Sequence, residues 1–141
     1  MIVQDFTIDK YQWYVKVYYA VSFYPIVEIV NDLYSTGCSD EEVEKCVEEL
    51  EKGNMNDGWI HSNKFARRSL IIIGMTDSAE QFLDTWDHEK GHLAMHICIT
   101  DNIDPYSEEY QYLTGEIGRQ MFKAAQPFLC DECRKHLLEE E

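Results

Sequence analysis

The spacing of hydrophobic residues along the chain predicts an alternation of strands and helices. Residues 13–22, WYVKVYYAVS, are rich in aromatic and β-branched side chains, which is typical of a strand. The apolar run SLIIIGM at 69–75 is the strongest strand signal, and residues 59–62 form another strand candidate just before it. These two strands are close enough for a hairpin, although the link at 63–68 is not a tight turn.

Two helices are predicted between the first strand and this hairpin. Pro25 opens the first, over residues 26–34, because proline is favoured in the first turn of a helix, and Gly37 ends it. Ser39 and Glu42 have the spacing of a capping box, which predicts the start of the second helix.

Two long helices and a short one are predicted in the C-terminal half. The first is capped by Ser78 or Asp77 and ends near residue 97. The second spans about 106–128, and a short helix follows from Asp131. The order of these elements predicts an α+β fold, in which a small, mainly antiparallel sheet packs on helices.

Composition and charge narrow the class of protein. With 45% hydrophobic residues in 141, the chain can bury a core, and it has no apolar run of about 18 residues that could span a membrane. No signal peptide is visible at the N-terminus, so we expect a cytoplasmic protein. The net charge of -15 argues against nucleic-acid binding, which needs clustered Lys and Arg. The acidic stretches at 40–51 and 139–141 are typical of a solvated helix face and a frayed tail.

The five cysteines, an odd number, indicate reduced thiols in a chain without a visible secretory signal. Cys130-x-x-Cys133, with His136 three residues later, has the spacing of half a zinc site. A closed structural zinc site needs four ligands, and the sequence contains no second Cys-x-x-Cys pair. Ordinary thiols are therefore the favoured interpretation.

The most informative motif is His88-Glu89-Lys90-Gly91-His92, which has the form His-Glu-x-x-His (HExxH). On a helix, residues four apart lie one turn apart on one face, so both imidazoles can reach one zinc ion at about 2.0–2.1 Å. Glu89 lies about 100° round the helix from His88, so it is free to take a proton from a zinc-bound water. The motif predicts a zinc-dependent hydrolase with Glu89 as the catalytic base.

A catalytic zinc site needs a third protein ligand, which should come from a downstream helix. The candidates are Glu108, Glu109, Glu116 and His96. By helical periodicity, Glu109 lies near the apolar stripe of the last long helix and Glu108 lies almost opposite. Periodicity therefore favours Glu109 if that stripe faces the metal, and Glu108 if the metal lies beside the first turn.

Four segments of the chain carry a resemblance to a known family: SLIIIG at 69–74, SAEQFLDT at 78–85, HEKGH at 88–92 and SEEYQYL at 107–113. Together they resemble the small HExxH metallopeptidases found in phages and gut-bacterial mobile elements, which are similar in plan to the gluzincin class of zinc peptidases. In that pattern a Glu stands four residues before the Tyr of a Tyr-Leu pair. The resemblance therefore implies Glu108 as third ligand, before Tyr112-Leu113, with His88 and His92 as the other two.

The resemblance covers about residues 58–125 and divides the single domain 1–141 into three segments. An N-terminal strand and helices at about 1–57 precede the metallopeptidase-like core, and 126–141 form a tail. The family motif normally has uncharged residues between its Glu and its second His, whereas this chain has Lys90 there. Gly91 is a poor helix former, and we expect it to mark the close approach of another backbone segment.

Several supporting roles follow from position. Asp84, one turn before His88, could accept the second ring N–H of that histidine, and His96 could contact substrate. Tyr106 or Tyr112 could donate to a developing oxyanion, although core packing is the commoner role of a tyrosine. The family resemblance implies an edge strand at 70–74 that pairs with substrate, whereas the unbroken apolar run favours an interior strand.

The sequence thus predicts a cytoplasmic, zinc-dependent hydrolase that acts on a peptide or protein substrate and binds neither nucleic acid nor membrane. Two other classes stay open. One is a non-catalytic metal-binding protein, favoured by the charge on Lys90. The other is an acidic protein of a phage or mobile element that docks on a basic partner through the -15 charge.

Overall fold

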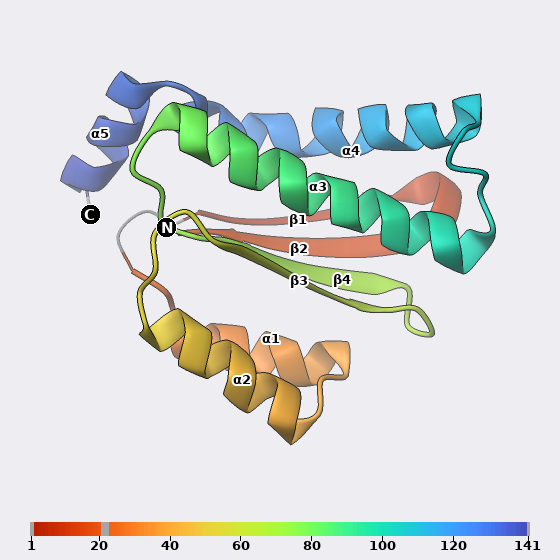
Figure 1. The fold of residues 1–141 in the computed structure, drawn as a ribbon, viewed down its shortest axis with the longest axis horizontal. Helices are drawn as coiled ribbons and strands as arrows, with labels where there is room; N and C mark the ends of the chain where they lie inside the picture. Colours follow the sequence, from red (N-terminus) through yellow and green to blue (C-terminus); the bar gives the residue numbers. More distant parts are fainter. Residues whose placement is uncertain (1, 21–22, 141) are drawn as a thin grey trace.

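A computed structural model describes residues 2–20 and 23–140 of the chain. A four-stranded sheet lies between two helical layers, with α1 and α2 on one face and α3 and α4 on the other (Figure 1). The helices are α1 (Ile26–Thr36), α2 (Asp40–Glu51), α3 (Ala79–Asp101), α4 (Glu108–Ala125) and α5 (Asp131–Glu140). The predicted α+β class is confirmed.

The sheet has the strand order β1-β2-β4-β3 and is mixed. Its strands are β1 (Ile2–Ile8), β2 (Trp13–Tyr19), β3 (Gly58–Asn63) and β4 (Arg68–Ile73). The β1–β2 and β3–β4 pairs are antiparallel, whereas β2 and β4 are parallel. A parallel pair needs a long crossover connection, and α1, α2 and β3 provide it. The sheet is therefore mainly antiparallel, as predicted.

The strongest strand signal belongs to an interior strand. Along β4, Ile71 and Ile73 are buried in the core against α3 and α4, while Leu70 and Ile72 are buried in the core against α1 and α2. Burial on both faces explains the unbroken apolar run. The interior interpretation of 70–74 is confirmed, and the edge strands of the sheet are β1 and β3.

Local capping signals set the helix boundaries. The Ser39 side chain accepts from the Glu42 backbone and the Glu42 side chain accepts from the Ser39 backbone, which confirms the capping box. Gly37 ends α1 with a φ of 100°, a left-handed conformation that suits glycine. Ser78 caps α3, which continues to Asp101 rather than ending near residue 97.

Other boundaries differ from the expectations. The strand β1 was not predicted, and it is half exposed, so its hydrophobic pattern is weak. The helix α4 begins after Ser107, whose side chain caps it, and it gives way after Ala125 to a 3-10 turn at Gln126–Leu129. Position 22, the predicted end of the first strand, lies outside the described residues.

The acidic stretch at 40–51 forms the solvent-facing side of α2, whereas Val43, Cys46 and Leu50 face the core. This is the solvated helix face that the sequence indicated. Among the described residues, no helix is both long and apolar enough to cross a membrane.

Candidate functional site

The HExxH motif lies in the middle of α3, where the helix packs beside the edge strand β3. Residues on one side of α3, including Phe82, Trp86 and Leu93, are buried in the core. His88 and His92 lie on an exposed flank of the helix, and Glu89 is buried between that flank and the core. The motif therefore lies at the boundary between the core and solvent.

The histidine pair, His88 and His92, brings two ring nitrogens together. The Nε2 atoms are 3.1 Å apart, and the rings are nearly perpendicular, at 79°. Two nitrogen ligands at about 2.0–2.1 Å from a tetrahedral zinc ion lie about 3.3 Å apart. The spacing of the histidine pair is close to that value, so the pair fits one zinc ion.

His96, one turn further along α3, has a different partner. Its Nδ1 lies 2.6 Å from the Ser62 hydroxyl of β3, and burial lowers the pKa of the imidazole. The His92 and His96 ring centroids are 6.2 Å apart. His96 thus connects the helix to the edge strand instead of extending the histidine pair.

Glu89 is an unusual carboxylate because it is only 4% exposed. Its Oε2 atom is fully buried and has no hydrogen-bond partner among the residues that the structure describes. Burial raises the pKa of this carboxyl group, and the nearby His88 and His92 act in the opposite direction. Burying a carboxylate without a partner is costly, and such groups are concentrated at functional sites.

The position of Glu89 depends on Gly58, the first residue of β3. A Cβ atom on residue 58 would lie 2.7 Å from Glu89 Cγ and 2.9 Å from its Oε1. Gly91, by contrast, has no described atom within 4 Å of the place its Cβ would occupy. The expectation that Gly91 marks a close backbone approach is therefore wrong, and the close approach is at Gly58.

A polar cavity of about 260 Å³ opens beside Glu89. The loop before β3 and the first half of α3 form this Glu89 cavity, which is lined by Asn56, Asp57, Gly58, Asp84, Thr85, His88 and Glu89. The Thr85 hydroxyl donates to the Asn56 carbonyl at 3.0 Å, which fastens the loop to the helix. The cavity thus joins the buried carboxylate to one member of the histidine pair.

Asp84 lines this cavity together with His88, but its hydrogen bond goes elsewhere. Its Oδ2 accepts from the Gln81 side chain at 3.2 Å. Within the described part of the chain, no hydrogen bond joins Asp84 to His88. The orienting role expected for Asp84 stays a prediction.

The structure does not bring Glu108 to the histidine pair. The Lys90 side chain points towards α4. Its Nζ lies 3.8 Å from the position that a Cβ atom on Gly118 would occupy, and Lys90 lines a small cavity together with Thr114 of α4. Lys90 and His88 are about 160° apart around the helix axis. The helix α4 therefore lies on the flank of α3 away from the histidine pair.

Glu108 is exposed in the first turn of α4, near the C-terminal end of α3. His92 lies nine residues before Asp101, the end of α3, which is about 13 Å along the axis. Of the other candidates, Glu109 accepts a hydrogen bond from the Tyr11 hydroxyl and Glu116 pairs with Arg119. Glu108 as third ligand stays a prediction, and it requires a rearrangement of the two helices.

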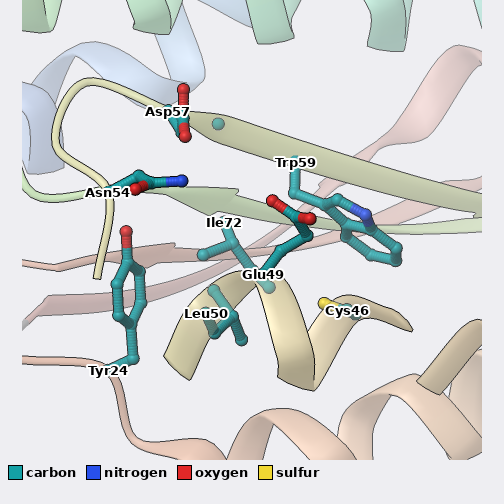
Figure 2. A pocket seen from close by; sticks show the side chains of 9 residues that line it. Tyr24, Cys46, Glu49, Leu50, Asn54, Asp57, Trp59 and Ile72 are labelled. Atoms are coloured by element: carbon teal, nitrogen blue, oxygen red, sulfur yellow. The ribbon is translucent and has the colours of Figure 1, made fainter. Parts of the chain in front are cut away.

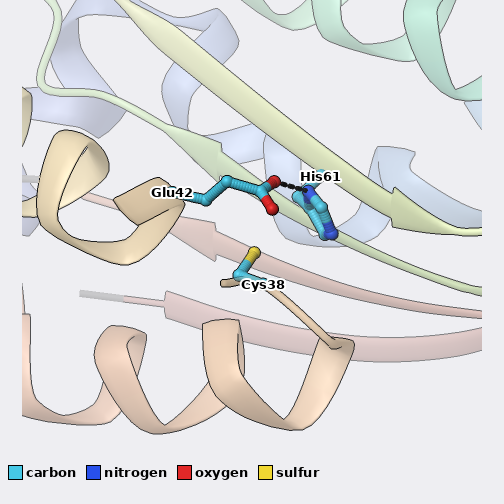
Figure 3. Close-up of side chains that lie close together, drawn as sticks. All are labelled: Cys38, Glu42 and His61. Carbon is cyan, nitrogen blue, oxygen red and sulfur yellow. Dashed lines mark ion pairs between the residues drawn. The ribbon is translucent and has the colours of Figure 1, made fainter. Parts of the chain in front are cut away.

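A second group of possible ligands lies on the opposite face of the sheet. Ligand atoms of Cys38, Glu42 and His61 all lie within 4.8 Å of one another, so this Cys38 cluster could hold a metal ion (Figure 3). Cys38 follows α1, Glu42 lies in the first turn of α2, and His61 lies on β3. Burial and the nearby Glu42 raise the pKa of the Cys38 thiol to about 12.

Sequence reasoning missed this cluster because only Cys38 and Glu42 are neighbours in the chain. Cys130 and Cys133, which did attract notice, are exposed free thiols at the start of α5. His136 Nδ1 lies 3.6 Å from Glu139 Oε2. In the described ranges, no group of three ligands forms around Cys130 and Cys133.

A third hollow, of about 190 Å³, lies between α2 and the sheet. Figure 2 shows Tyr24 and Asn54 on one side of it and Trp59 and Cys46 on the other. Asp57 and Gly58 line both this hollow and the Glu89 cavity. The loop before β3 thus separates the two hollows.

No family model, curated protein or solved structure that was compared with the chain matches it. The resemblance to HExxH metallopeptidases therefore stays an expectation.

Proposed function

We propose that the chain is a zinc-dependent hydrolase that cleaves peptide bonds, with Glu89 as the catalytic base. The observation that supports this proposal most is the buried Glu89 carboxylate, which has an oxygen without a described partner and lines a cavity together with His88. A folded protein keeps such an unfavourable group where chemistry requires it.

The histidine pair can supply two ligands of one zinc ion. The two Nε2 atoms of the histidine pair are 3.1 Å apart, near the separation that tetrahedral zinc requires. Zinc bound there would polarise the scissile carbonyl and lower the pKa of a bound water to about 7. Both histidines lie on an exposed flank of α3, so substrate can reach them from solvent.

Each residue then has a defined task. His88 and His92 would hold the metal through Nε2, and Glu89 would take a proton from the attacking water and pass it to the leaving amine. Because Glu89 is almost completely buried, few water molecules compete for its proton.

The edge strand supports a peptide as substrate. β3 pairs only with β4 among the described strands, so its outer edge can pair with an extended chain. Gly58 and Asn63 begin and end this strand, and Gly58 also lines the Glu89 cavity. A peptide bound along β3 would therefore lie beside the buried base.

The third metal ligand remains to be chosen by experiment. Glu108 is the residue that the resemblance implies, whereas Asp84 and Asp57 already line the cavity with His88. We expect Asp84→Asn to weaken zinc binding if the ligand comes from the cavity wall. Glu108→Gln would weaken it instead if α4 moves.

The proposal is tested with zinc-loaded protein and fluorescently labelled casein as a general peptidase substrate. Glu89→Gln should abolish cleavage while the bound zinc is kept, and Glu80→Gln, in the first turn of the same helix, is the matched control. Full activity of Glu89→Gln would refute the mechanism. Zinc binding without cleavage of casein or of a peptide library would favour a non-catalytic metal protein.

A further inference from the structure

The Cys38 cluster combines three side chains from three elements on the sheet face opposite α3. Cys38 is only 6% exposed. Among residues 2–20 and 23–140, no acceptor takes a hydrogen bond from its thiol, whereas the buried Cys98 thiol donates to the Ile103 carbonyl at 2.7 Å. The Cys38 sulfur is thus a buried group without a described hydrogen-bond partner that faces a carboxylate and an imidazole.

Independent local features fix the position of each member of the cluster. The Cys38 backbone N–H donates to the Leu33 carbonyl at 3.0 Å, next to the left-handed Gly37 that ends α1. The Oε1 atom of Glu42 accepts from the Ser39 backbone in the capping box, which leaves Oε2 for another partner. Cys38 and Glu42, which are constrained in this way, lose little conformational freedom on binding an ion.

His61 completes the cluster from the edge strand. Its register opposite Leu70 of β4 and its ring stacked on Trp59 set its orientation. Its Nδ1 lies 3.4 Å from Glu42 Oε2, as the dashed line in Figure 3 shows. Nitrogen and oxygen ligands of one tetrahedral zinc ion lie about 3.3 Å apart, so two of the three ligands already have the required spacing.

We propose that Cys38, Glu42 and His61 form a second metal site, separate from the histidine pair, which binds zinc and fastens the α1–α2 layer to the edge strand. Thiolate, imidazole and carboxylate are all ligands of zinc in proteins. When the metal–sulfur bond forms, the thiol proton leaves to solvent. Because Glu42 and His61 are partly exposed, water completes the coordination from outside.

Cobalt titration of the metal-free, full-length protein tests this site, because Co²⁺ bound to a thiolate gives a sulfur-to-metal charge-transfer band in the near ultraviolet. The histidine pair has no sulfur ligand, so only a cysteine site gives the band. We expect the wild-type protein to show this charge-transfer band, and the band should reach its maximum when one cobalt ion is bound per Cys38 cluster. The variant with both His88→Ala and His92→Ala should keep it.

Three substitutions should remove the band or raise the cobalt dissociation constant about tenfold or more: Cys38→Ser, His61→Gln and Glu42→Gln. Glu42→Gln is the most informative variant because Gln also forms a capping box, so the start of α2 is preserved while the anionic ligand is lost. His61→Gln changes a partly exposed position on the edge strand and should leave folding intact.

The control replaces both Cys130 and Cys133 with serine, and it should keep the band. No band in the wild-type protein would overturn the proposal. So would a band that survives Cys38→Ser but disappears in the control. These outcomes do not depend on whether the histidine pair is catalytic, because that site is tested by cleavage of casein.

Discussion

Replacing Gly58 with alanine tests whether the backbone of β3 holds Glu89 in place. The added Cβ would lie 2.7 Å from Glu89 Cγ, 2.9 Å from Oε1 and 3.0 Å from Cδ. These distances are too short for real contacts, so one group must move. Glu89 can move only towards its cavity, because the rest of the side chain is enclosed.

The expected cost follows from the geometry. Overpacking a buried site costs about 1–3 kcal/mol, and the neighbouring cavity of about 260 Å³ gives the carboxylate room to turn. We therefore expect Gly58→Ala to reduce the free energy of unfolding by about 1 kcal/mol, the lower end of this range. That loss lowers Tm by roughly 3–4 °C in a chain of this length. The same shift should reduce cleavage about 100-fold, since a base displaced by about 1 Å is poorly aligned.

A double-mutant cycle with Glu89→Ala isolates the contact, because that substitution removes every Glu89 atom that the new Cβ would meet. In the Glu89→Ala background, Gly58→Ala should be neutral or slightly stabilising, which gives a coupling energy of about 1 kcal/mol. Urea unfolding of the four metal-free proteins measures it. Gly91→Ala is the matched control, since its Cβ meets no described atom within 4 Å, and it should stabilise α3 by about 1 kcal/mol.

Equal costs of Gly58→Ala in the two backgrounds would refute this reasoning. A destabilising Gly91→Ala would show that another segment approaches that part of α3 after all.

Three further predictions concern stability. Ser78→Ala removes the cap of α3 and should cost about 1 kcal/mol in urea unfolding, with little change in the denaturant slope. The buried Tyr19 hydroxyl donates to Gln4 Oε1 at 3.0 Å, and burial raises its pKa. The neutral Tyr19 hydroxyl therefore contributes fully to the free energy of unfolding below about pH 10. This contribution falls by about 1.4 kcal/mol per pH unit as the pH rises towards the folded-state pKa. Tyr19→Phe should therefore make the stability of the protein less dependent on pH in the alkaline range. Zinc at 100 times its dissociation constant should stabilise the protein by about 2.7 kcal/mol per site, and a chelator should reverse this; a Tm that does not respond to either would count against both metal sites.

Local signals in the sequence predicted the helix starts well. The capping box of Ser39 and Glu42 and the cap at Ser78 depend on residues only three apart, so they form wherever the rest of the chain folds. The strand β1 escaped prediction because it is half exposed and its hydrophobic pattern is weak, although it pairs with the next strand, β2, and also contacts α4. One of these contacts joins Gln4 to the Gln120 carbonyl of α4.

Contacts between elements could not be predicted in the same way. Periodicity placed His88 and His92 one turn apart on the same flank of α3, as the structure has them, since it fixes which residues share a helix face. It does not say which flank a neighbouring helix takes. In the structure Lys90 lies beside Gly118, so α4 takes the flank of α3 that is away from the histidine pair.

The Cys38 cluster depends on the order of strands in the sheet. His61 meets Cys38 and Glu42 because the parallel pairing of β2 and β4 leaves β3 at the edge, beside the end of α1. A single sequence carries no local signal for that arrangement. The close approach at Gly58 has the same origin, since it requires β3 to pass directly beneath Glu89.

The central claim is that His88 and His92 bind a metal ion, and metal analysis by mass spectrometry tests it most directly. The comparison is best made in a background with both Cys38→Ser and His61→Gln, in which the Cys38 cluster lacks two of its three ligands. After zinc is supplied and excess removed, we predict one zinc ion per chain with the histidine pair intact and none when both are alanine. Equal zinc content in the two proteins, or no zinc in either, would contradict the account.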